Sequence, residues 1–494
     1  MDDARFDALT RRTAAASRRG LMQAAAGWLA LATGNEAAAT RCRGGRIRCG
    51  RHCVDPQSSR THCGGCKTAC GDGETCATGI CCPDGQRNCA GVCRADCDGA
   101  KAKRPFPQHV AYPGAAIFPN HRSRAELDAD VALAYDRWKA RYVVAAGNDD
   151  GQPLYRIAFA KPGKSDHAVT VSEGQGYGMV VLAHMAGHDP EARTIFDGLW
   201  RFARAHPSCV DDRLMNWRIP QTGGSGCDSA FDGDNDMAYA LLLASAQWGD
   251  DGAIDYRQAF ATLAGGVFAS TIGPDSRLPL LGDWVEADGR KYNQWSTRTS
   301  DYMTGHFRAF ARADGKNAWR DVVAACQQTI HALQAQFAPE TGLLPDFVQP
   351  KSATDHAPRP ADPRFLEGPN DGAYDYNAGR DPWRIGTDAL VNGDATATAQ
   401  ALQMSRWIAG AAHGDPRAIR SGYQLDGTPS PNSNYFSTFF VAPFGVAAML
   451  DERAQAWLNA IYDAVRDVQQ DYYEDSVTLQ CLLAMTGNWW DPTV

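Results

Sequence analysis

The chain has no long hydrophobic run. Its 494 residues contain no apolar stretch of about 20 residues, the length that a helix needs to cross a bilayer. An apolar run near the N-terminus, residues 21–33, is only moderately hydrophobic and too short to span. This absence argues against a transmembrane protein, so we expect a soluble mature chain with no membrane partner.

The N-terminal segment is typical of an export signal. Residues 17–22, SRRGLM, resemble a twin-arginine signal, and the moderately apolar run follows them. Three alanines at residues 37–39 offer a small-residue cleavage site. We therefore predict a signal peptide over residues 1–39 and a mature protein that is secreted or periplasmic.

Cysteine is scarce outside one short stretch. Of the 16 cysteines, 12 fall within residues 42–97, where large apolar residues are few. An even number of cysteines in an exported chain predicts disulfides, because so short a segment cannot build a sufficient core. The spacing of Cys63 and Cys66 also fits a zinc site, but regular ligand quartets are missing. We predict a disulfide-rich domain over residues 40–98 and leave its connectivity open.

This cysteine-rich stretch repeats internally. The same spacing occurs twice, at Cys42, Cys49 and Cys53 and at Cys82, Cys89 and Cys93. It resembles the Cys-rich repeats related to plant stigma-specific proteins, over about one repeat. Two roles stay open, carbohydrate or surface binding and a spacer.

The larger part of the chain has no excess of positive charge. Residues 1–104 hold 17 Lys and Arg against 10 Asp and Glu, whereas residues 105–494 hold 32 against 47. An acidic catalytic region argues against a nucleic-acid substrate. It is compatible with a neutral glucan, and more so with a cationic polymer such as chitosan.

Helical patterns dominate after a linker. Residues 99–122 are rich in Lys, Pro and Gly and predict a linker. Helical spacing then begins at candidate core positions Leu127, Val131, Tyr135, Trp138 and Tyr142. Further helices are expected near residues 172–187, 190–206, 234–249, 256–270, 299–313, 316–337, 383–391, 394–412, 434–450, 454–469 and 473–486. About a dozen helices predict an all-α toroid over residues 123–494, which composition alone cannot distinguish from an α-solenoid.

One acid stands among glycines at the start of a predicted helix. Residues 171–179, VSEGQGYGM, precede an apolar run, and Ser172 can cap a helix that begins here. Glu173 would project from the first turn, and the glycines would let a bulky ligand lie against the backbone. The alternative is that Glu173 only complements the helix dipole.

The flanking sequence distinguishes these interpretations, because SEGQGYGM resembles the general-acid motif of glycoside hydrolase family 8. Four further segments follow in the order of that family: AFDGDNDMAYALLLASAQW from residue 230, SDYM with HFRAF from residue 300, GLLPDF from residue 342 and YNAGRDPWRI from residue 376. The resemblance spans most of residues 105–494. It implies an (α/α)6 barrel with a cleft at one end and an inverting glycosidase that needs no cofactor.

Inverting hydrolysis needs two carboxyl groups, one to protonate the leaving oxygen and one to activate a water, roughly 6.5–9.5 Å apart. The resemblance implies Glu173 as the general acid, since desolvation in an aromatic-walled cleft favours its neutral form. One branch of the family has an aspartate base where this chain has Asn377, and an amide cannot accept the proton.

The branch with Asn at that place takes its base from an inserted loop upstream, here residues 348–371. The segment FLEGPNDG from residue 365 resembles that branch and implies Glu367 as the general base. Asp362, Asp371 and Asp375 are weaker candidates, and Glu367 would otherwise be a solvated loop residue.

The resemblance also assigns the residues around the reacting sugar. Asp232 would bind and distort the sugar and position the attacking water. The run DGDND resembles the start of a calcium loop, but the residues after it lack the Gly and the terminal Glu, so we expect no metal. Tyr376 and Arg380 are expected to hydrogen-bond near the base and the reacting sugar, and Asn377 is a further substrate-binding candidate. The alternative for Tyr376 and Arg380 is core support for the turn at residues 382–384.

Polymer binding needs flat apolar platforms. The candidates are Trp217, Trp284 and Tyr302, whereas helical core spacing predicts a structural role for Trp138, Trp200, Trp248 and Trp319. Cys209 and Cys227 flank the loop of Trp217 and can form a disulfide that steadies it. Cys326 and Cys481 lie in apolar helices and are expected to be free or buried.

The sequence therefore predicts a secreted, monomeric, inverting endo-β-1,4-glycan hydrolase. Cellulose or mixed-linkage β-glucan is the first expected substrate, chitosan the second and xylan a third. An inactive carbohydrate-binding protein is the alternative from another class, and the retention of Glu173 and a base argues against it. A polysaccharide lyase would need a Lys, Tyr or His near an acid-neutralising group in place of two carboxyl groups.

Overall fold

The computed structural model describes residues 47–494 except residues 51, 78, 90, 91, 95–101, 114, 115 and 221–225. The predicted signal peptide over residues 1–39 lies outside the described residues. No helix in the described ranges is long and apolar enough to cross a membrane.

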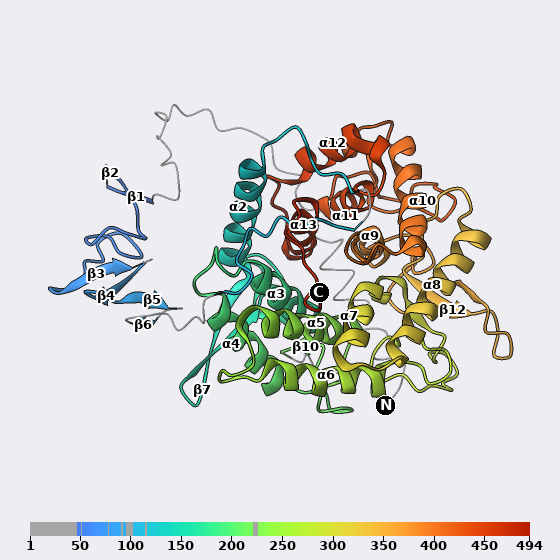
Figure 1. Cartoon of the computed structure of the whole chain (residues 1–494), viewed down its shortest axis with the longest axis horizontal. Coiled ribbons are helices and arrows are strands. Elements are labelled where there is room, and N and C mark those ends of the chain that lie inside the picture. The colour runs from blue at the N-terminus through green and yellow to red at the C-terminus, as the bar shows by residue number, and fades with distance from the viewer. Residues whose placement is uncertain are drawn as a thin grey trace, which may run out of the picture.

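Twelve α-helices of the described residues form two concentric rings (Figure 1). Contacts between successive inner helices close a ring, and each inner helix also contacts at least one outer helix. The inner helices are α3 (Ser172–His184), α5 (Phe231–Trp248), α7 (Thr304–Asp314), α9 (Asp381–Asn392), α11 (Thr438–Ala448) and α13 (Tyr472–Met485). The outer helices are α2 (Arg124–Tyr142), α4 (Ala192–Ala205), α6 (Tyr256–Thr271), α8 (Ala318–Phe337), α10 (Ala395–Ala411) and α12 (Gln455–Val465). The fold is the predicted (α/α)6 barrel.

Sequence pattern separates the two rings. Every residue of α3, α11 and α13 is buried, and beyond the first turns, which carry the acids of α3 and α13, these helices are mostly apolar or small. Outer helix α2 instead buries one stripe, formed by the five predicted core positions from Leu127 to Tyr142, and it begins with a capping box of Ser123 and Glu126. A helix surrounded by neighbours must be apolar all round, whereas a peripheral helix needs one apolar face.

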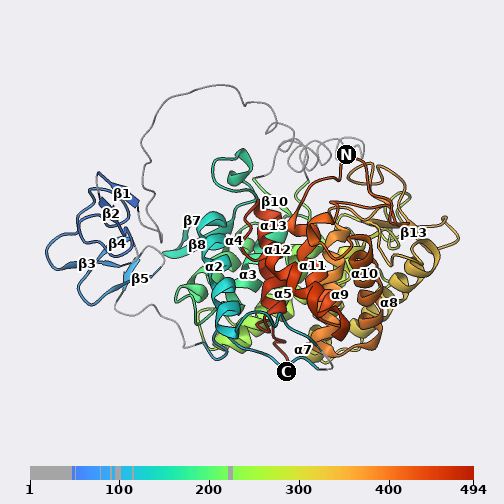
Figure 2. The same cartoon turned by 90° about the horizontal axis from the view of Figure 1, so that it is seen from above.

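The inner helices start at the same end of the barrel, and short strands lead into several of them. β9 (Thr170–Val171) precedes α3 and pairs antiparallel with β10 (Arg218–Ile219). A three-stranded antiparallel sheet combines β11 (Thr297–Arg298), which precedes α7, with β12 (Phe347–Pro350) and β13 (Pro358–Pro360). Figure 2 shows β10 at the upper end and the C-terminus at the lower end. A hairpin of β7 (Val143–Asp149) and β8 (Gln152–Ile157) packs against α4.

The segment before α2 closes the opposite end of the barrel. Its backbone N–H groups donate to carbonyls at or beyond the C-terminal ends of inner helices: Lys103 to Gln247 (3.0 Å), Phe106 to Ala186 (2.7 Å), Val110 to Gly487 (2.7 Å) and Ile117 to Met449 (2.9 Å). These bonds satisfy carbonyls near the ends of inner helices. The described part of the predicted linker, residues 102–113 and 116–122, therefore packs as part of the barrel.

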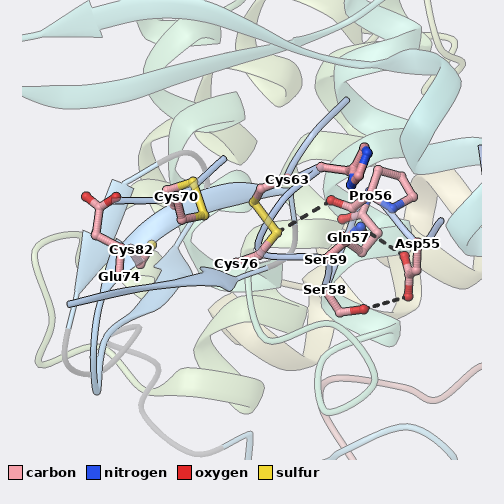
Figure 3. The surroundings of a disulfide bond; sticks show 12 residues. Asp55, Pro56, Gln57, Ser58, Ser59, Cys63, Cys70, Glu74, Cys76 and Cys82 are labelled. Carbon is pink, nitrogen blue, oxygen red and sulfur yellow. Dashed lines mark hydrogen bonds between the residues drawn. A yellow bond between two sulfur atoms is a disulfide. The ribbon is translucent and has the colours of Figure 1, made fainter. Parts of the chain in front are cut away.

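The cysteine-rich domain consists of short hairpins tied by disulfides. The repeated cysteine spacing gives two equivalent hairpins, β1 (Ile47–Cys49) with β2 (His52–Val54) and β5 (Arg87–Cys89) with β6 (Val92–Arg94), and β3 (Glu74–Ala77) pairs with β4 (Ile80–Pro83) between them. The bonds Cys49–Cys66, Cys63–Cys76, Cys70–Cys81 and Cys82–Cys93 confirm the disulfide prediction over zinc. Figure 3 shows Cys63–Cys76 beside the turn that Asp55 stabilises by accepting from the Gln57 N–H (2.9 Å) and the Ser58 hydroxyl (2.9 Å).

Candidate active site

The general-acid candidate lies at the start of an inner helix. Glu173 is the second residue of α3 and is 8 % exposed. The prediction that Ser172 caps this helix is wrong. Val171 is the N-cap residue, because β9 continues directly into the helix, and its apolar side chain makes no cap hydrogen bond.

The glycines around Glu173 serve helix packing. A Cβ atom on Gly176 would lie 2.8 Å from the carbonyl oxygen of Gly233, and one on Gly233 would lie 2.3 Å from the carbonyl carbon of Ser172. The expectation that a ligand lies against these glycines is therefore wrong. Their missing side chains let the backbones of α3 and α5 touch, which fixes Glu173 relative to Asp232.

One arginine joins Glu173 to Asp232. Nη1 of Arg380 donates to Glu173 Oε2 (3.0 Å) and to Asp232 Oδ2 (2.9 Å), and Nη2 donates to Ser300 Oγ (2.7 Å). Arg380 is 1 % exposed, so these charge-assisted bonds are shielded from water. The hydroxyl of Tyr472, from the start of α13, donates to Glu173 Oε1 (3.0 Å).

Asp232 remains ionised in this setting. Burial alone would raise its pKa, but Arg380, and then Arg298, outweigh burial and hold the pKa below its usual value. A charged carboxylate at the N-terminus of α5 also complements the helix dipole.

Glu367 faces the same network from the loop after β13. Its Oε2 accepts from Asn377 Nδ2 (3.0 Å), and its Oε1 lies 3.4 Å from Arg298 Nη2. The Glu367 side chain is 26 % exposed. The carboxylate therefore points toward the Asn377–Arg380 pair while it keeps access to water.

Arg298, on β11, is itself held by an acid and an aromatic ring. Its Nη1 lies 3.4 Å from Asp301 Oδ2, and its guanidinium lies 5.2 Å from the ring of Phe347. Burial raises the pKa of Asp301 to about 7, against the opposing effect of Arg298.

The three alternative bases have other partners. Asp362, whose side chain is 66 % exposed, binds Arg359 (2.8 Å) and Gln349 (2.8 Å). Asp371 accepts three backbone N–H groups, from residues 366 (2.7 Å), 367 (2.9 Å) and 368 (2.7 Å), and so shapes the turn that carries Glu367. Asp375 accepts from the amide of Asn370 (2.6 Å).

Asp346, in the segment GLLPDF, anchors the turn that carries Asn377 and Arg380. Its Oδ1 accepts backbone N–H groups of residues 375 (3.1 Å), 377 (3.0 Å) and 378 (2.7 Å). Burial, and then nearby Asp375, raise its pKa well above the usual value. A buried side chain thus replaces the backbone partners that an irregular turn lacks.

The other two acids of the DGDND run have structural partners. Asp236 accepts from Arg384 Nη1 (2.9 Å) and Nη2 (2.5 Å) and from His306 Nε2 (2.9 Å). Burial alone would raise the pKa of Asp236, yet Arg384 and His306 lower it to about 2. Asp234 accepts the N–H of Met215 (2.9 Å), two residues before Trp217.

Two of the three predicted aromatic platforms are partly exposed. Trp217 and Trp284 are half-buried, and their loops are tied together by Asp283, which accepts from Ser208 Oγ (2.5 Å) and Ser229 N–H (2.8 Å). The predicted disulfide Cys209–Cys227 is confirmed and spans the loop of Trp217. Cys326 and Cys481 are free and buried, as expected.

Tyr302 is not a platform. Only 1 % of its surface is exposed, so no sugar can stack on its ring. It follows the 3-10 turn Thr299–Asp301 and belongs to the core between β11 and α7. Tyr376 is also buried, with its ring stacked on Phe439 and its hydroxyl bonded to Tyr435 (2.8 Å).

Sequence reasoning missed four polar residues of this network. Tyr472 and Arg298 contact the two proposed catalytic carboxylates, while Ser300 and Asp346 lie in recognised segments but received no role. The position of Arg298, two residues before the segment SDYM, was the available signal for that residue. For Tyr472 the tyrosine pair at the start of the helix predicted near residues 473–486 was the only hint.

Buried carboxyl groups at one end of an (α/α)6 barrel, bridged by arginine and accompanied by half-buried tryptophans, define a glycoside hydrolase site. The model of the family described as Glycosyl hydrolases family 8 matches residues 112–487, and the chain belongs to that family. A beta-glucanase of Niallia circulans is 40 % identical over 394 residues, 79 % of this chain and 92 % of the relative. An endoglucanase of Bacillus sp. (strain KSM-330) is 37 % identical over 402 residues, 80 % of this chain and 83 % of the relative.

Solved structures agree. The apo structure of a beta-1,3-1,4-glucanase from Paenibacillus sp. X4 is similar with a TM-score of 0.73 and 40 % identity, over 78 % of this chain and 99 % of the other. A cold-adapted family 8 xylanase, 18 % identical with a TM-score of 0.61, shares the fold.

Proposed function

We propose that this protein is an inverting endo-β-1,4-glycan hydrolase that acts on mixed-linkage β-glucan or cellulose. The observation that carries the proposal is the pair of carboxyl groups Glu173 and Glu367. A series of hydrogen bonds through Arg380 and Asn377 connects them. The names of the relatives, a beta-glucanase, an endoglucanase and a beta-1,3-1,4-glucanase, support a β-glucan as substrate.

In this mechanism Glu173 donates its proton to the glycosidic oxygen as the bond to the anomeric carbon breaks. Glu367 accepts a proton from a water whose oxygen bonds to that carbon from the opposite face. The products are one sugar hydroxyl on the leaving chain and one new hydroxyl of inverted configuration. The partial exposure of Glu367 supports the water-activating role, and the burial of Glu173 supports the role of acid.

Asp232 would hold the sugar at the point of cleavage. It is ionised, it lies on the helix next to that of Glu173, and Arg380 fixes its orientation. Those features suit an acceptor for a sugar hydroxyl, and they suit a general acid poorly because Asp232 carries no proton to give.

The choice of base is tested by Glu367→Ala, with Asp362→Asn as the matched control on the same loop. Glu367→Ala should lose roughly 10²–10⁴-fold in kcat, and azide should partly restore turnover by replacing the activated water. Asp362→Asn should keep its activity, because the Asp362 carboxylate bonds Arg359 and Gln349, outside the Glu173–Glu367 network. Near-normal activity of Glu367→Ala would remove Glu367 as the base.

The substrate is tested by reducing-sugar assays on mixed-linkage glucan, carboxymethylcellulose, chitosan and xylan under one set of conditions. We expect the highest kcat/KM on mixed-linkage glucan or carboxymethylcellulose. Chitosan is the second candidate, since the acidic residues 105–494 would attract a cationic polymer. Higher kcat/KM on chitosan would replace the glucan assignment and leave the reaction class intact.

We also propose that residues 1–39 direct export and that the mature enzyme is a monomer. Replacing Arg18 and Arg19 by Lys should retain the protein inside the cell, which immunoblots of cell fractions would detect. Sedimentation of the secreted protein should give one species of the monomer mass.

A further inference from the structure

Asn377 makes side-chain contacts with three ionisable residues at once, Glu367, Asp346 and Arg380. Its Nδ2 donates to Glu367 Oε2 (3.0 Å) and lies 3.4 Å from Asp346 Oδ2. Its Oδ1 accepts from Arg380 Nη2 (3.2 Å). Asn377 is 3 % exposed, so water does not compete for these partners.

The chemistry of these neighbours fixes which way the amide points. A guanidinium can only donate, so it requires the amide oxygen, and the Glu367 carboxylate on the other side requires hydrogen atoms. Only an amide presents an acceptor to Arg380 and two donors to Glu367 and Asp346 from one planar group. An aspartate would satisfy Arg380 but would place a second oxygen against two other carboxyl groups.

We propose that Asn377 is a positioning residue for the general base, and that its amide holds the Glu367 carboxylate in a fixed orientation. This inference rests on the proposed role of Glu367. Arg298 holds the other oxygen of the same carboxylate, at 3.4 Å.

The charged groups that face Glu367 come from several elements. Arg298 approaches from β11, Asp346 from the turn before β12, Asp371 from the same loop and Arg380, through Asn377, from the turn before α9. Asp346 and Asp371 are acids, whereas the amide of Asn377 and the guanidinium of Arg298 are the groups that donate to the Glu367 carboxylate. Replacing that amide by a carboxylate therefore acts directly on the protonation of the base.

Asn377→Asp and Asn377→Ala test this inference through pH profiles of kcat/KM on mixed-linkage glucan. Asn377→Asp should move the acidic limb of the profile upward by about one pH unit or more, since a like charge near 3 Å disfavours ionisation of Glu367. Asn377→Ala should lower kcat roughly ten- to a hundredfold and leave KM little changed. Asn370→Ala is the matched control, because Asn370 is an amide of the loop that carries Glu367 and it bonds Asp375. This variant should leave the acidic limb in place.

The backbone N–H of residue 377 can keep its bond to Asp346 in every variant, so the turn itself should be preserved. If Asn377 had only a structural role, its replacement would lower the yield of folded protein and leave the acidic limb of the pH profile unchanged. An unshifted limb in a folded Asn377→Asp enzyme overturns the inference.

A double-mutant cycle separates this inference from the proposed function. In the azide-rescued Glu367→Ala enzyme, adding Asn377→Ala should cost little, because the carboxylate that Asn377 holds is already gone. Equal losses with and without Glu367 would mean that Asn377 acts through Arg380 or the sugar, and the inference would fail while the base stands. If Glu367→Ala alone keeps its activity, the proposed base and the inference both fail.

Discussion

Replacing Glu173 with Gln is the most direct test of the acid, and the structure predicts that the variant folds. The Glu173 carboxylate accepts one bond from Arg380 and one from Tyr472. Arg380 can only donate, so the amide oxygen of a Gln must face it. The hydroxyl of Tyr472 can donate or accept, so it can rotate to accept from the amide nitrogen. Both hydrogen bonds survive, and only the transferable proton is lost.

The size of the defect should depend on the leaving group. Losing a general acid typically costs 10²–10⁴ in rate, which corresponds to about 2.7–5.5 kcal/mol of transition-state stabilisation. In a polysaccharide the leaving group is a sugar alkoxide, which leaves poorly unless it is protonated. Hydrolysis of a polysaccharide should therefore show the full loss in kcat, with KM nearly unchanged. In a dinitrophenyl cello-oligosaccharide the leaving group is dinitrophenolate, a stable anion that needs no protonation. The same variant should therefore hydrolyse this substrate at close to the wild-type rate.

The assay is therefore a comparison of kcat/KM for the two enzymes on the two substrates. Asp362→Asn, which removes the charge from an exposed acid of the base loop, is the control and should change neither value. Equal losses on polysaccharide and on the activated substrate would show that Glu173 binds or orients the sugar and does not protonate it.

Three further outcomes are expected. Proton NMR of fresh digests should show the α-anomer first, and early β-anomer would mean a covalent intermediate. Replacing Cys209 and Cys227 together by Ser should raise KM for polysaccharide more than it lowers kcat, because it loosens the loop of Trp217; an unchanged KM would contradict a role for this loop in binding. Arg384→Met leaves the buried carboxylate of Asp236 without its ion pair and should lower the free energy of unfolding at pH 7 by about 3–5 kcal/mol. Since the pKa of Asp236 is lowered to about 2, the stability from this pair is complete above the unfolded value of 3.8 and is lost as the pH falls toward 2. The deficit measured by urea unfolding and tryptophan fluorescence should therefore narrow by pH 3, and a deficit independent of pH would contradict this account.

The sequence by itself determined the helical class, the core stripe of the first outer helix, the disulfide nature of the cysteine-rich stretch and the family. These features depend on local information: periodicity within one helix, cysteine spacing and short motifs that occur in order. The Cys209–Cys227 bond could also be predicted, because both cysteines flank one loop. Glu173 and Asp232 were located by motif, and each indeed starts an inner helix.

Only the tertiary structure decided which side chains meet, because the site is assembled from residues far apart in the chain. Arg380 lies 207 residues from Glu173 and Tyr472 lies 299 residues from it, and no local pattern connects them. The glycines near Glu173 suggested space for a ligand, but α5 fills the space beside Gly176, and side chains of Ile157 and Tyr472 fill the space beside the other two, contacts that sequence spacing cannot reveal. Tyr302 suggested a platform by its type, yet the ring closure of the barrel buries it. The role of Asn377 is the clearest case. The sequence does not show which groups the amide contacts, and only the tertiary structure places two carboxyl groups beside its nitrogen and an arginine beside its oxygen.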